Sequence, residues 1–254
     1  LTCVGLCWSS CTNEVDEFIG NVEPSTRSVS TALNANLASL FTGGAPTLTS
    51  AEIKEVNDAY AKMTSINCYR NIDEAVRNKT SYAGTIFLDD TYASAYFRKG
   101  SLAFPPYGIL ASSMEHEFIH MYQRDVQGKK VDTDKEKRDT GMMEFELAFY
   151  QGIIRYIHAG YSWTFKGEDG DPSYQSLWTS GLTDPSLIPQ YEREFQTYVA
   201  SICANGKPTS IDINEFVKWS NIFGEYSRGY SGKGYKFGNY DYGTSCINSL
   251  LKLY

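Results

Sequence analysis

The sequence predicts an α+β fold that is rich in helix and holds a small sheet. Apolar residues recur at three- and four-residue intervals in several stretches, which is the spacing of amphipathic helices. Two short runs near residues 84 and 93 are instead rich in residues that favour strands. Segments 160–181 and 224–243 are rich in Gly, Tyr, Ser and Asp, so the C-terminal part is predicted to mix helices with irregular loops.

The N-terminal half is predicted to contain two helices and then two strands. Apolar residues at helical spacing predict the first helix over 25–41. Thr49 and Glu52 have the spacing of a capping box, which predicts that a second helix begins there. The apolar face of this second helix consists of Ile53, Val56, Tyr60 and Met63. Residues 84–88 and 93–97 are predicted to form a β-hairpin.

Two further helices are predicted to follow the strands. A pair of prolines ends the extended region, and apolar spacing predicts a long helix over 107–124. The loop that follows, 125–139, is rich in charged residues of both signs. The next helix is expected over 142–157, with Asp139 or Thr140 as its N-cap.

Three helices are predicted in the C-terminal part of the chain. Two of them cover 189–202 and 212–223, and a short one covers 246–253. Asp212 and Glu215 have capping-box spacing, which places the start of the middle helix at Asp212.

Charge and hydropathy exclude two classes of partner. The net charge is −7 at pH 7, and in the segment richest in lysine, 129–138, acidic residues interleave with the basic ones. A nucleic-acid partner is therefore not expected. No apolar run approaches the roughly 18 residues that a membrane-spanning helix needs, so no such span is expected.

The six cysteines point to an extracytoplasmic location. Their even number would suit three disulfides in an oxidising compartment. Residues 1–12 also resemble the end of a bacterial lipoprotein signal, because an apolar stretch and two serines precede Cys11 and an acidic segment follows it. The resemblance implies a lipid anchor at Cys11. An ordinary buried N-terminal segment is the alternative interpretation.

The string from His116 to His120, His-Glu-Phe-Ile-His, is the most informative feature of the sequence. On a helix, residues four apart project from the same face, so both imidazoles can bind one metal ion. Glu117 is one position further along, where its carboxylate can take a proton from a zinc-bound water. The pattern predicts Zn²⁺ as cofactor, His116 and His120 as ligands and Glu117 as general base. A pair of partly buried core histidines is the alternative.

A catalytic zinc normally has three protein ligands, so a third ligand must come from elsewhere in the chain. The extended metzincin motif requires Gly and then His at the positions of Gln123 and Val126, so that class is excluded. His158 is the one remaining histidine and lacks any motif around it. It is expected to have a structural or supporting role.

The segment from Glu144 to Ala148, Glu-Phe-Glu-Leu-Ala, resembles the ligand helix of the gluzincin zinc peptidases, in which a glutamate on a second helix follows the histidine motif. The resemblance implies Glu144 as the third ligand. Glu146 is the second candidate, because Leu147 and Ala148 depart from the small and polar residues that the family has at these positions. Side chains two positions apart on a helix are separated by about 200° around its axis, so only one of the two glutamates can face the metal.

The resemblance also implies a zincin-like fold, with a small sheet packed on the motif helix and an edge strand beside the substrate cleft. An extended peptide or protein substrate would pair with that strand through main-chain hydrogen bonds. A Tyr, His or Arg is expected to donate to the oxyanion, and His158 and Tyr161 are the candidates.

The chain is expected to have three parts: an N-terminal segment (1–22), a zincin-like catalytic region (23–160) and a C-terminal lobe (161–254). The leading function is a zinc-dependent hydrolase that cleaves peptide bonds. The alternative is a secreted or surface protein with a structural or relic zinc site, which binds a glycan or protein through the five tyrosines of 226–242. Glu117 favours the enzyme, because a structural zinc site is closed by a fourth ligand and needs no base.

Overall fold

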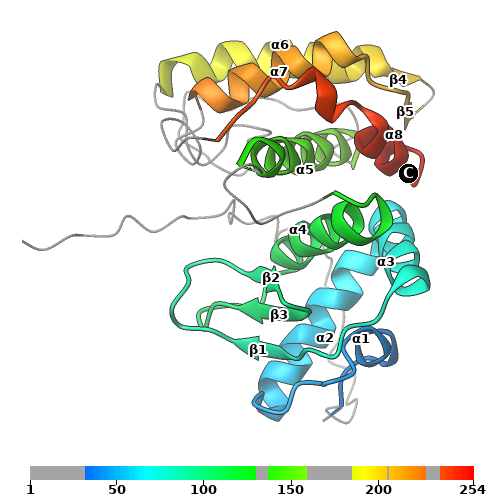
Figure 1. Cartoon of the computed structure of the whole chain (residues 1–254), viewed down its shortest axis with the longest axis vertical. Coiled ribbons are helices and arrows are strands. Elements are labelled where there is room, and N and C mark those ends of the chain that lie inside the picture. Colours follow the sequence, from blue (N-terminus) through cyan, green and yellow to red (C-terminus); the bar gives the residue numbers. More distant parts are fainter. Residues whose placement is uncertain (1–31, 130–136, 159–184, 205, 227–234) are drawn as a thin grey trace, which may run out of the picture. The chain divides into compact units, whose positions relative to one another are not determined.

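The chain forms two compact units, residues 1–126 and 127–254. The computed structural model describes residues 32–129, 137–158, 185–204, 206–226 and 235–254 (Figure 1). Both units are rich in helix, and a three-stranded mixed sheet lies in the first, which confirms the α+β class. The boundary expected at residue 160, between the catalytic region and the C-terminal lobe, lies among residues that the structure does not describe, so it stays a prediction.

Three helices open the described part of the first unit: α1 (Ala35–Leu40), α2 (Ser50–Ser65) and α3 (Asn67–Lys79). The capping box predicted at the start of α2 is confirmed, because Thr49 and Glu52 each bond the other's backbone N–H. In α1, the Asn34 side chain accepts a hydrogen bond from the backbone N–H of Asn36 at 2.9 Å and caps the helix. The prediction that this helix already includes residues 32–34 is therefore wrong. No helix was predicted where α3 forms.

The sheet of the first unit consists of β1 (Ile86–Leu88), β2 (Tyr96–Arg98) and β3 (Ser101–Phe104). Its order is β1-β3-β2: β1 pairs with β3 in parallel and β2 pairs with β3 antiparallel. The hairpin predicted between the first two strands is therefore wrong. The hairpin joins β2 to β3 instead, through Lys99 and Gly100, whose φ angles of 51° and 77° suit a two-residue turn.

The motif helix α4 (Ala111–Met121) is shorter than predicted and continues into a π-helical turn, η1 (Tyr122–Val126). The expected start at Tyr107 is wrong, because residues 107–110 follow the two prolines in a turn and in extended backbone. α4 packs against α2, α3 and β2. Its fully buried side chains are Met114, Phe118, Ile119 and Met121.

Four helices make up most of the described part of the second unit: α5 (Lys137–His158), α6 (Ile188–Ile202), α7 (Ile213–Tyr226) and α8 (Ser245–Leu251). Short 3-10 turns (Pro185–Leu187, Tyr240–Tyr242) and a two-stranded ribbon, β4 (Cys203–Ala204) with β5 (Lys207–Pro208), complete it. α6, α7 and α8 confirm the predicted helices. α5 begins earlier than predicted, so Asp139 and Thr140 lie inside it and do not cap it.

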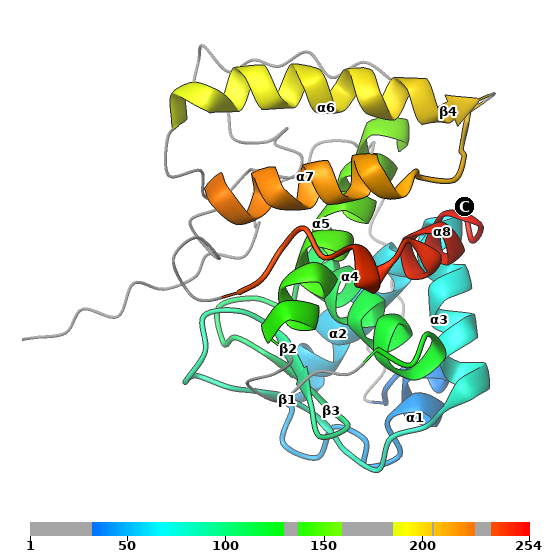
Figure 2. The same cartoon turned by 45° about the horizontal axis from the view of Figure 1, so that its top comes forward.

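Aromatic rings from three helices form the core of the second unit. Phe145 and Phe149 of α5 meet Phe216 of α7, with ring centroids 5.0 and 6.0 Å apart. Phe149 also contacts Phe195 of α6 at 5.4 Å. α6 and α7 run side by side in both views (Figures 1 and 2). No helix in the described ranges is both long and apolar enough to cross a bilayer.

Candidate metal centre

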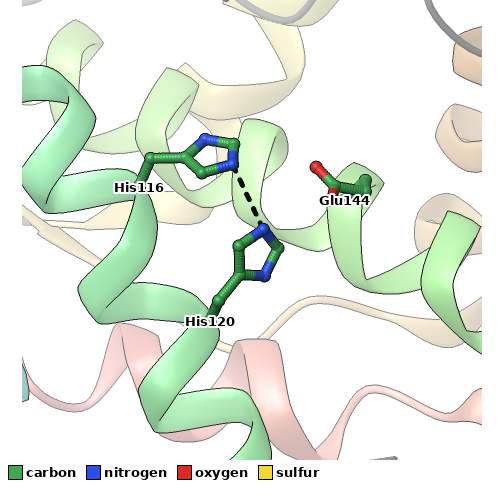
Figure 3. Close-up of side chains that lie close together, drawn as sticks. All are labelled: His116, His120 and Glu144. Carbon is green, nitrogen blue, oxygen red and sulfur yellow. Dashed lines mark hydrogen bonds between the residues drawn. The ribbon is translucent and has the colours of Figure 1, made fainter. Parts of the chain in front are cut away.

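His116 and His120 face each other on α4. Their Nε2 atoms are 3.1 Å apart, and their ring centroids are 4.7 Å apart (Figure 3). The spacing of four residues puts both rings on one face of the helix. The opposite, apolar face of α4 is buried against the rest of the first unit, so the histidine face is held in a defined orientation and stays partly accessible.

Glu117 is a buried carboxylate beside this pair, with a side chain that is only 4% exposed. Its Oε1 lies 4.0 Å from His116 Nε2, the nitrogen that faces His120. The carboxylate is thus close to the atoms that could bind a metal, although it belongs to the next position along the helix.

Gln123 contacts the second histidine from the π-helical turn. Its Oε1 lies 2.9 Å from Nδ1 of His120, and its side chain is fully buried. From the sequence, Gln123 is informative only because it stands where the metzincin motif requires Gly.

A group of three described residues could hold one metal ion: His116, His120 and Glu144. Each offers one ligand atom, and these atoms all lie within 4.8 Å of one another (Figure 3). All three side chains are partly exposed. Two imidazoles and one carboxylate are a donor set that suits zinc and several other divalent ions.

Glu146, the second candidate for the third ligand, lies in the core of the second unit. It is fully buried and accepts a hydrogen bond from the Tyr242 hydroxyl at 2.9 Å. Burial raises the pKa of that hydroxyl and of the nearby Cys246 thiol, and the charge of Glu146 raises both further. Both groups therefore stay protonated. Lys129 lies over the Tyr242 ring, with Nζ 3.7 Å from the centroid.

Tyr235, one of the five tyrosines of 226–242, lies near Glu144 and is not among the oxyanion donors that the sequence predicts. It packs on α5 beside Gly141, where an added Cβ would come within 3.3 Å of the Tyr235 Cβ. Burial, followed by the charge of Glu144, raises the pKa of the Tyr235 hydroxyl. The hydroxyl is therefore protonated at neutral pH and can donate a hydrogen bond. Its proximity arises from a contact between segments almost a hundred residues apart, for which no local signal exists.

The remaining predicted residues are placed only in part. His158 is the last residue of α5, and Tyr161 lies outside the described residues. Among the described residues, Cys68, Cys203 and Cys246 form no disulfide with one another. Cys11 is also outside the description, so the lipid anchor stays a prediction. Of the described tyrosines in 226–242, Tyr240 is 57% exposed and Tyr242 is buried.

Comparison with known proteins gave no match: no protein-family model, curated protein or solved structure is similar to this chain.

Proposed function

We propose that this chain is a zinc-dependent peptidase of the gluzincin type, with a zincin-like catalytic region. The observation that carries the proposal is the group of His116, His120 and Glu144 at ligand distance. Glu117, a buried carboxylate, lies beside this group on the same helix as the histidines.

The spacing of the histidines supports zinc as the metal. His116 and His120 would hold a zinc ion through imidazole nitrogens, a ligand type that zinc favours. With Glu144, the protein would supply three ligands and leave a fourth position for water, as in catalytic sites.

The chain's own residues then supply the acid–base chemistry. When bound, a zinc ion would lower the pKa of a coordinated water to about 7 and polarise a substrate carbonyl. Glu117 accepts the proton of the attacking water and returns it to the leaving amine. Its burial beside His116 keeps the carboxylate close to the ligand nitrogens without making it a ligand.

Strand β2 is the proposed docking edge for an extended peptide. It lies at one edge of the sheet and packs against α4, the helix that carries the histidines. The opposite edge is already occupied, because the Ile86 N–H donates to the Gly44 carbonyl at 2.8 Å and the Gly43 N–H donates to Gly84 at 3.2 Å. Main-chain pairing along β2 would hold a peptide with little dependence on its side chains.

Tyr235 is the proposed donor to the developing oxyanion. Replacing Tyr235 by Phe removes only the hydroxyl, so we expect kcat to fall by about 10²–10³-fold, the usual effect of losing one such donor, with KM little changed. Steady-state kinetics on a peptide substrate measure both constants. Tyr240→Phe, at an exposed tyrosine of the same segment, is the control. An unchanged kcat in Tyr235→Phe would remove Tyr235 from the mechanism.

The function itself is tested by metal analysis followed by hydrolysis. We expect one equivalent of zinc in the purified protein, cleavage of casein or of a peptide library, complete loss of cleavage with a chelator, and recovery on adding zinc. His120→Asn, purified in the same way, controls for a contaminating peptidase and should neither bind zinc nor cleave. Cleavage that resists the chelator, or a metal held by four protein ligands, would contradict the proposal.

A further inference from the structure

Gln123 places an amide where a metal ligand needs a supporting hydrogen bond. The side chain is fully buried, and its Oε1 is 2.9 Å from Nδ1 of His120. The carbonyl oxygen of a glutamine side chain is an acceptor, so the proton of this bond comes from Nδ1.

The contact with Gln123 determines which ring nitrogen of His120 has the lone pair that could bind a metal. A neutral imidazole carries one proton, so an N–H at Nδ1 leaves the lone pair on Nε2. Nε2 is the atom that faces Nε2 of His116 at 3.1 Å. The hydrogen bond that Nδ1 donates to Gln123 therefore sets both the tautomer and the direction of the His120 ring before any metal binds.

The π-helical turn that carries Gln123 is held by contacts on its far side. The Tyr82 hydroxyl donates to the Asp125 carboxylate, and Arg124 Nε donates to the same carboxylate at 2.9 Å. The Arg124 guanidinium lies over the Phe97 ring of β2, 4.2 Å from its centroid. π-helical turns are rare, and they are frequently found at functional sites. The turn is thus tied to the rest of the first unit at the residues that follow Gln123.

We infer that Gln123 is a positioning residue for the metal: it fixes His120 with Nδ1 protonated, so that the lone pair of Nε2 is the one offered to the metal. This inference rests on the proposed function, since it assumes that His120 is a ligand. It adds a residue that neither contacts the ion nor belongs to the five-residue motif. Its effect should appear in metal affinity and in the His120 tautomer, with activity changing only as a result.

The test compares Gln123→Met, which keeps the length but has no strong acceptor, with Gln123→Glu, which keeps one. Zinc affinity, measured by competition with a chelator of known affinity, should fall by about 10–100-fold in Gln123→Met. Gln123→Glu should bind zinc at least as tightly as the wild type, because a carboxylate also accepts from Nδ1. Thermal unfolding of each variant without metal separates this effect from a loss of fold.

Nitrogen NMR of the metal-free protein at alkaline pH gives a second readout. The chain has three histidines, so the spectra of two variants, His158→Gln and His116→Gln, assign the signals of all three rings. His120 should be the Nδ1–H tautomer in the wild type and shift towards Nε2–H in Gln123→Met. If the wild type binds zinc and Gln123→Met binds it equally tightly, the inference about Gln123 is overturned and the proposed function is not. A wild type that binds no zinc would overturn the proposed function as well.

Discussion

Replacing Glu117 by Gln is expected to lower kcat by about 10²–10⁴-fold and to leave the bound zinc in place. The amide has the same shape as the carboxylate but cannot take a proton from water. Glu117 is outside the group of ligand atoms, so the metal should still bind. Because the side chain is 4% exposed, the neutral amide should be at least as well tolerated by the fold as the buried charge.

The measurement is kcat together with zinc content on the same preparation. Glu115→Gln is the matched control, because it makes the same chemical change two positions earlier on α4. The control should keep both the activity and the metal. An unchanged kcat in Glu117→Gln would refute the general base, whereas loss of zinc would mean that Glu117 contributes to metal binding.

Glu144→Gln is expected to weaken metal binding strongly, whereas Glu146→Gln is expected to leave it almost unchanged. Glu144 offers an oxygen within 4.8 Å of the histidine nitrogens, so replacing its charged carboxylate by an amide should weaken zinc binding by more than about 100-fold, beyond the loss of a supporting hydrogen bond. Glu146→Gln keeps an oxygen that can accept from the Tyr242 hydroxyl, so zinc affinity should change by less than about threefold.

Zinc titrations of the two variants distinguish the candidates directly, because the substitutions are chemically identical and two residues apart. Circular dichroism of both proteins checks that α5 is intact. Loss of zinc in Glu146→Gln with retention in Glu144→Gln would reverse the assignment. Retention in both would show that the third ligand lies elsewhere.

The parts of the fold that the sequence predicted well depend on local bonds. The start of α2 follows from Thr49 and Glu52, and that of α7 from Asp212, whose carboxylate accepts from the Asn214 N–H at 2.8 Å. Caps of this kind join residues two or three apart, so they can be read from the sequence. Strand pairing could not be read from the sequence, because β1 pairs with β3 and not with β2, the next strand along the chain. The turn between β2 and β3 also depends on Lys99, whose positive φ angle is one that non-glycine residues seldom adopt.

The candidate site divides in the same way. Helical spacing brings together His116 and His120 and was visible in the sequence. The contact of Gln123 with His120 depends on a π-helical turn, for which no residue pattern was recognised. Tyr235 approaches Glu144 through packing on Gly141, a contact between distant segments. Residues of that kind become visible only once the tertiary contacts are known.

The hydrogen bond between Glu146 and Tyr242 has a consequence for the rotational register of α5. Consecutive residues of a helix are about 100° apart, so the direction in which Glu146 points determines the direction in which Glu144 points. Rotating α5 about its axis so that Glu146 pointed elsewhere would break the hydrogen bond between the Tyr242 hydroxyl and the Glu146 carboxylate. The hydroxyl would lose this acceptor while it stayed buried, which is unfavourable. The last twenty residues of the chain thus determine which of the two glutamates points into the core of the second unit and which points out of it.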